Sequence, residues 1–163
     1  MNYNFSVLLD TSFFIRLLNK YDPVHGNAKD YFKFFLENGI KLKISTISIA
    51  EYCVGGDFSD LPLKNLQILP FNYDHAIRTG EFARIMFNNY KNIKIPVEPR
   101  AIIPNDAKLF AQADIDPAIS YFVTSDTRTI NKTRKLLNHG LKIGFKIIDI
   151  HQPYNKQFGL LDL

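Results

Sequence analysis

Hydrophobic and polar positions follow two patterns that succeed one another along the chain. Short apolar runs, rich in β-branched and aromatic residues, predict strands at residues 5–10, 42–46, 66–69, 121–124 and 145–150. Between these runs, apolar residues recur every three or four positions and predict helices at 11–20, 23–37, 48–53, 74–90, 105–113 and 127–138. Glycines after three of the helices, Gly39, Gly55 and Gly140, are typical helix stops.

Strands that alternate with helices indicate an α/β fold. Such a chain forms right-handed crossovers and a parallel sheet covered on both faces, so we predict a three-layer α/β/α architecture with a central parallel sheet. The 163 residues suffice for one core, and we expect a single domain over residues 1–163. Residues 91–104 contain three prolines, which predict a loop or short extended piece able to cover an active site.

Composition places the chain among folded, non-membrane proteins. Hydrophobic residues make up 46% and charged residues 22%, near the averages for globular domains. No apolar stretch approaches the roughly 20 residues of a membrane helix, and no signal peptide is evident. The single cysteine, Cys53, cannot form a disulfide within its own chain. We therefore expect a cytoplasmic protein.

Four acidic residues follow predicted strands or begin predicted helices. Asp10 ends the first strand, and Glu51 lies in the first turn of the helix after the second. Asp126 follows the strand at 121–124, and Asp106 begins a helix. Ligands of open parallel sheets bind beyond the carboxyl ends of the strands. These acids are therefore the first candidates for a functional site.

Each acid also has a purely structural interpretation. Asp10 and Asp126 suit helix N-caps, Ser48 with Glu51 matches a capping box, and Asp106 suits the helix dipole. Taken singly, each position favours that interpretation; taken together, they favour a shared site. Carboxylates about 4 Å apart repel by roughly 4 kcal/mol per pair at an effective dielectric near 20, so a cluster requires a cation or shared protons. Oxygen ligands favour Mg²⁺ or Mn²⁺.

Four segments carry a resemblance to a known family. In order they are Val-Leu-Leu-Asp-Thr-Ser, Ser-Thr-Ile-Ser-Ile-Ala-Glu, Asn-Asp-Ala-Lys-Leu-Phe-Ala-Gln-Ala and Phe-Val-Thr-Ser-Asp. They resemble the motifs of the PIN-domain family, many of whose members are ribonucleases and many small ones VapC-type toxins held by an antitoxin. By position, the family's four acids fall on Asp10, Glu51, Asp106 and Asp126. The resemblance implies an RNA substrate, an antitoxin partner and a homodimer.

The mechanism that we expect is metal-dependent hydrolysis. Asp10, Asp106 and Asp126 would hold one or two Mg²⁺ or Mn²⁺ ions, and Glu51 would complete the cluster or orient the attacking water. By the resemblance, Ser12 and Thr124 are the supporting hydroxyls. Hydrolysis would leave a 5′-phosphate. A covalent intermediate is not expected, because no Ser-His or Cys-His pairing is evident.

The charge balance suits a nucleic-acid substrate. The net charge is +4, from 20 basic and 16 acidic residues, and would be +8 without the four site acids. The tentative RNA-binding residues lie on the helix after Asp126: Arg128, Lys132, Arg134 and Lys135. Arg100 and Lys108 are weaker candidates, and a solvated helix face is the competing interpretation.

Other functions compete with this hypothesis. The module could bind RNA or protein without cutting, or it could cut DNA, because carboxylate-bound metals do not distinguish the two sugars. A phosphatase that forms an acyl phosphate would require an acid at Ser12, and a receiver domain would require another acid pair. Some family members carry one more acid or Asn after the last acid, for which Asn131 is the candidate here. Three further acids, Asp114, Asp116 and Asp149, are assigned structural roles in a loop and at a strand end.

Overall fold

A computed structural model describes residues 3–88 and 103–160. Its strands are β1 (Ser6–Leu9), β2 (Lys41–Ser45), β3 (Leu66–Leu69), β4 (Ile119–Thr124) and β5 (Lys146–Asp149). Its α-helices are α1 (Thr11–Leu18), α2 (His25–Glu37), α3 (Thr46–Tyr52), α4 (Tyr73–Asn88), α5 (Asn105–Ile115), α6 (Thr127–Asn138) and α7 (Tyr154–Gln157). Two 3₁₀ turns, η1 (Phe58–Asp60) and η2 (Leu63–Asn65), precede β3.

The five strands form one sheet in the order β3-β2-β1-β4-β5. Every pair of neighbouring strands is parallel, so all carboxyl ends lie at one edge. From β1 the chain builds outward through β2 and β3, then crosses back to place β4 on the other side of β1. The boundary between β1 and β4 is therefore the topological switch point, where open α/β sheets bind ligands.

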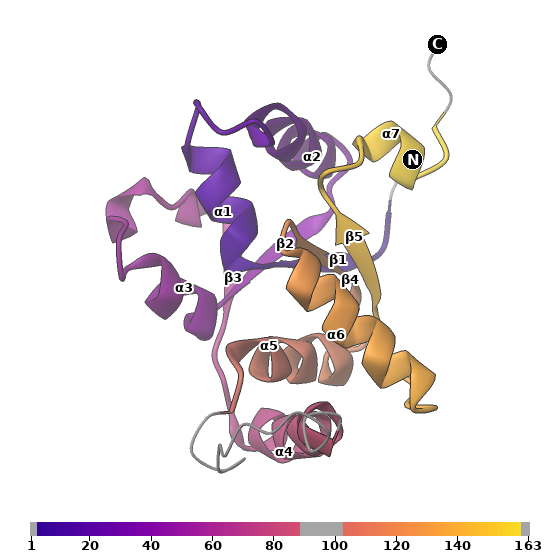
Figure 1. The fold of residues 1–163 in the computed structure, drawn as a ribbon. Helices are drawn as coiled ribbons and strands as arrows, with labels where there is room; N and C mark the ends of the chain where they lie inside the picture. The colour runs from indigo at the N-terminus through magenta and orange to yellow at the C-terminus, as the bar shows by residue number, and fades with distance from the viewer. Residues whose placement is uncertain (1–2, 89–102, 161–163) are drawn as a thin grey trace.

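Helices cover both faces of the sheet, as predicted (Figure 1). Side chains of β1 alternate between the faces: Val7 and Leu9 join a core that includes Phe13 of α1, whereas Leu8 joins a core that includes Phe82 of α4 and Phe110 of α5. This alternation follows from the two-residue period of a strand. The three-layer α/β/α fold class is thus confirmed.

Two of the boundaries that differ from the sequence prediction concern acidic residues. Helix α3 begins at Thr46, because Ser45 rather than Ser48 is its N-cap and accepts a 2.9 Å hydrogen bond from the backbone of Ile47. The capping box assigned to Ser48 and Glu51 was therefore wrong. Asp114, assigned to a loop, lies inside α5.

The sequence also predicted a loop at 91–104 and glycines at the ends of α2 and α6. The predicted loop at 91–104 lies almost wholly outside the described residues. Gly39 and Gly140 follow α2 and α6 with φ of +66° and +74°, the left-handed geometry expected at helix ends. Within residues 3–88 and 103–160, no helix combines the length and apolar character needed to cross a membrane.

Candidate metal site at the carboxyl edge of the sheet

Asp10 lies directly after β1, at the switch point of the sheet. Its backbone N–H still donates to Val123 of β4, at 2.9 Å, which fixes the residue to the sheet. Its Oδ1 accepts from the N–H of Thr11 at 2.8 Å and so caps α1. The side chain is buried, with the residue only 6% exposed. The capping role predicted from the sequence is real, and it leaves Oδ2 pointing to other partners.

Two hydroxyls converge on that second oxygen. Ser12 Oγ donates to Asp10 Oδ2 at 2.7 Å, and Thr124 Oγ1 donates to the same atom at 2.8 Å. The hydroxyls also accept backbone N–H groups from the turn after β4, Ser12 from Ser125 at 3.0 Å and Thr124 from Asp126 at 3.0 Å. Ser12 and Thr124 therefore orient Asp10 and link it to the backbone of Asp126.

Glu51 reaches the same edge from α3. Its Oε2 accepts a short hydrogen bond from the hydroxyl of Thr11, and its Oε1 accepts from Asn105 Nδ2 at 2.6 Å. Thr11 is the first residue of α1 and Asn105 the first of α5. Glu51 thus connects the starts of two helices instead of turning back to its own backbone, as the capping-box interpretation required.

Asp106 follows in the first turn of α5 and faces α6. Its Oδ2 accepts from the ammonium of Lys132, and its Oδ1 accepts from Thr129 Oγ1 at 3.2 Å. Asn131, the candidate for the family's further polar residue, is exposed and its Oδ1 lies 3.5 Å from Arg134 Nη1. On the same helix, Thr129 rather than Asn131 donates to a site acid, Asp106.

The electrostatics of the acids differ with their surroundings. Burial raises the pKa of Asp10, and although its two hydroxyl partners lower it, repulsion from Asp106 and Glu51 raises it further. Partial burial also raises the pKa of Asp126, but hydrogen bonds from Arg128 and attraction by Arg128 and Lys132 outweigh that effect and lower it overall. Asp106 and Glu51 therefore both lie near enough to Asp10 to disfavour its ionised form.

The donor set fits a hard divalent cation by its chemistry. The acids and hydroxyls offer oxygen atoms alone, and the mutual repulsion around Asp10 is what a bound cation would relieve. Asp10 Oδ1 accepts one hydrogen bond and retains a lone pair. Over the described ranges, however, no three His, Cys, Asp or Glu side chains are arranged to hold a metal as they stand. Asp106 is paired with Lys132, and Glu51 with Thr11 and Asn105.

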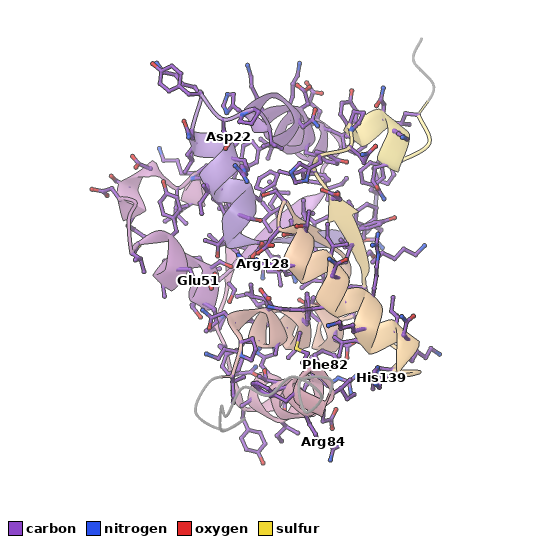
Figure 2. The ribbon with its side chains drawn as sticks, viewed as in Figure 1. Asp22, Glu51, Phe82, Arg84, Arg128 and His139 are labelled. Carbon is purple, nitrogen blue, oxygen red and sulfur yellow. The ribbon has the colours of Figure 1, made fainter. Side chains whose placement is uncertain are left out.

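The basic residues of α6 point in different directions. Arg128 is highly exposed and its Nε lies 3.4 Å from Asp126 Oδ1, whereas Lys132 is turned inward to Asp106. Arg134 lines a cavity of about 470 Å³ with residues of β5, on another side of the helix. Lys135 is exposed. Figure 2 shows Arg128 near the middle of the view and Glu51 to its left, whereas Arg84 of α4 lies at the lower end.

The two weaker basic candidates have different outcomes. Lys108 Nζ donates to Asn105 Oδ1 at 3.1 Å, on the residue that contacts Glu51. Arg100 lies outside the described residues.

Three polar contacts of the acids were missed from the sequence: Thr11, Asn105 and Thr129. Each has a local signal, because Thr11 and Asn105 adjoin site acids and Thr129 lies about one helical turn after Asp126.

The three acids that were assigned structural roles from the sequence make contacts away from the candidate site. Asp114 accepts from Arg78 at 2.7 Å, Asp116 from Lys43, and Asp149 from the backbone of His151 at 3.0 Å.

Comparisons with known proteins give structural relatives only. No family model matches the chain, and no curated protein matches it. Among solved structures, the VapBC2 complex of Rickettsia felis, bound to a promoter DNA fragment, matches with TM-score 0.54 and 18% identity over 88% of this chain and 98% of that chain. DNA-bound VapBC from Salmonella typhimurium matches with TM-score 0.54 and 18% identity, covering 90% and 98%.

A third relative is named as a toxin. VapC20 of Mycobacterium tuberculosis, described as cleaving the sarcin-ricin loop, matches with TM-score 0.50 and 17% identity, covering 77% of this chain and 94% of that chain. At these identities the likeness concerns the backbone architecture. The chain therefore has the fold seen in these VapC-type structures, the PIN-like α/β/α fold that its motifs predicted.

Proposed function

We propose that this protein is a metal-dependent endoribonuclease that hydrolyses RNA phosphodiester bonds. The observation that carries the proposal is that Thr11 and Asn105 link Asp10, Glu51 and the start of α5 at the switch point of the sheet: Thr11 donates to both Asp10 and Glu51, and Asn105, next to Asp106, donates to Glu51. The backbone N–H of Asp126 donates to the Thr124 hydroxyl that also donates to Asp10, which supports including Asp126 in the same site. The shared fold with VapC-type structures supports the same reaction class.

Each acid has a proposed role. Asp10, Asp106 and Asp126 would hold Mg²⁺ or Mn²⁺, which supplies charge neutralisation at the phosphate and lowers the pKa of a water molecule. Glu51, held by Thr11 and Asn105, would complete the ligand set or orient the attacking water. Ser12 and Thr124 fix the Asp10 carboxylate by donating to its Oδ2. Water attack would leave a 5′-phosphate on the product.

RNA would approach along α6. Arg128, Lys132 and Lys135 are spaced by four and three residues, which places them along one side of the helix. Arg128 is the strongest candidate for a phosphate contact, because its exposed guanidinium lies beside Asp126. Arg134 is the weakest, because it lines the cavity toward β5.

An antitoxin partner follows from the same proposal. The two VapBC relatives are complexes, and this chain exposes apolar side chains on α1 and after α3, among them Ile15, Val54 and Phe58. A small protein encoded beside this chain should co-purify with it and suppress its cleavage of RNA. A homodimer, common in the resembled family, is the proposed oligomer.

The direct test is cleavage by the purified protein of labelled RNA and single-stranded DNA panels in Mg²⁺, Mn²⁺ or EDTA. We expect RNA to be cut in either metal, the products to carry 5′-phosphates, and EDTA to abolish cutting. Preferential cutting of DNA would transfer the proposal to the DNA nuclease. RNA that is bound but left intact in both metals would favour a binding module and contradict the proposal.

A further inference from the structure

Lys132 is a basic residue that the fold turns toward the acids. Its ammonium donates to Asp106 Oδ2, and Thr129, about one turn earlier on α6, donates to Asp106 Oδ1 at 3.2 Å. The side chains of Lys132 and Asp106 are only 27% and 20% exposed. Each oxygen of one proposed metal ligand thus accepts a hydrogen bond from another helix.

The Lys132 ammonium is near two of the proposed metal ligands, Asp106 and Asp126. The charge of Lys132 lowers the pKa of Asp126, and the charge of Asp106 raises the pKa of Asp10. The Lys132 ammonium therefore lies among acids from which a divalent cation would take its ligands. An ammonium offers three donors and one charge, whereas a divalent ion offers two charges and coordinates the carboxylate directly. The two cations compete for the same carboxylate.

We propose that Lys132 is an internal cation that competes with the divalent ion for Asp106 and thereby sets the metal affinity of the site. The inference rests on the proposed function, because the divalent ion belongs to it. Without metal, Lys132 compensates the charge of Asp106 and links α6 to the first turn of α5. With metal, Asp106 exchanges its ammonium partner for the ion.

The exchange links metal binding to RNA binding. While Lys132 is paired with Asp106, the ion pair has no net charge to attract a phosphate. Once released from Asp106, the Lys132 ammonium remains on α6 beside the site and its positive charge is available to a phosphate. The candidate RNA contact of Lys132 is therefore available only after the metal has bound. The order of events is metal first and RNA second.

The test measures Mn²⁺ binding without RNA, by titration calorimetry or by the loss of the free-ion electron paramagnetic resonance signal. Wild type is compared with Lys132→Met, with Lys132→Arg, which keeps the charge, and with Lys142→Met, which removes an exposed charge from the loop after α6. We expect Lys132→Met to bind Mn²⁺ about tenfold more tightly, equivalent to about 1.4 kcal/mol. Lys142→Met and Lys132→Arg should stay close to wild type.

Thermal unfolding supplies a second readout. Lys132→Met should unfold at a lower temperature than wild type in EDTA, because Asp106 loses its partner, and saturating Mn²⁺ should close that gap. If the methionine variant does not fold, Lys132→Gln replaces it.

The two proposals fail in different ways. Equal or weaker Mn²⁺ binding by Lys132→Met would overturn the competition and leave the proposed nuclease intact. A wild-type protein that neither binds Mn²⁺ nor cuts RNA would overturn both.

Discussion

Asp10 carries a free-energy cost that its neighbours only partly offset. A buried carboxylate is expensive to ionise, and the nearby Asp106 and Glu51 add repulsion. Hydrogen bonds from Ser12, Thr124 and the backbone of Thr11 stabilise the ionised form. Structural capping alone would not require this burial, because an exposed N-cap performs the same task. The cost is understandable if the carboxylate serves a bound cation.

The pKa of Asp10 leads to a prediction about pH. Its folded-state pKa is raised above the unfolded value, so folding favours the protonated acid, and the stability of metal-free protein falls as pH rises from the unfolded pKa through the folded pKa. Asp10→Asn keeps an N-cap but does not titrate. We measure the free energy of unfolding by urea in EDTA. The value for Asp10→Asn minus the value for wild type should increase with pH and then level off. A difference that stays constant from about pH 4 to pH 8 would contradict the assignment.

Local sequence patterns predicted single residues unevenly. The caps at Asp10 and Asp126 were recognisable, because a cap depends on its own turn of helix. Ser45 and Ser48 both precede apolar helical residues, and only the end of β2 decides that Ser45 is the cap. The contact of Lys132 with Asp106 joins two helices that are distant in sequence, and no local pattern encodes it.

At the scale of elements, α5 brings Asn105 and Asp106 to the site and must be held in place. Gln112, on the same helix, is fully buried. Its Oε1 accepts from Ser45 Oγ at 2.5 Å, and its Nε2 donates to the backbone oxygen of Leu69 at 3.1 Å. This one side chain therefore ties α5 to the ends of β2 and β3.

Removing that connection should be costly. Gln112→Ala leaves a cavity and deprives Ser45 and Leu69 of buried partners, so we expect a loss of about 2–4 kcal/mol in the free energy of unfolding. Gln67→Ala, at an exposed position of β3, is the matched control and should change stability by less than about 0.5 kcal/mol. Urea denaturation of both variants measures the difference. Similar small losses in the two would show that Gln112 does not anchor the helix.

At the scale of the whole molecule, the parallel sheet explains why residues at strand ends predicted a shared site. Parallel strands place all carboxyl ends at one edge, so acids that follow different strands meet whatever their separation in sequence. Asp10 and Asp126 follow β1 and β4, which are neighbours in the sheet. Strand order itself was not predictable from periodicity, because apolar runs of similar length do not specify their partners. The motifs predicted a shared site, and the topology brings the ends of β1 and β4, which Asp10 and Asp126 follow, to the same edge of the sheet.

The basic surface leads to a prediction about salt. In the Asp10→Asn background, expected to bind RNA without cutting it, Arg128→Gln should weaken RNA binding and reduce the slope of log affinity against log salt by about 0.7 if one phosphate contact is lost. Arg84→Gln removes the same charge from α4, away from the centre of the view in Figure 2, and should leave the slope nearly unchanged. Equal effects in fluorescence-anisotropy titrations would contradict a local contact at Arg128.

The central claim is that the acids at the switch point perform metal-dependent catalysis. Its most direct test compares RNA cleavage in Mg²⁺ by wild type, Asp10→Asn and Asp149→Asn. Asp149 is a suitable control because it ends the neighbouring strand β5 and contacts His151 instead of the acids. We expect Asp10→Asn to lose at least about a hundredfold in rate while remaining folded, and Asp149→Asn to cut like wild type. Full activity of Asp10→Asn, or equal losses in both variants, would contradict the account.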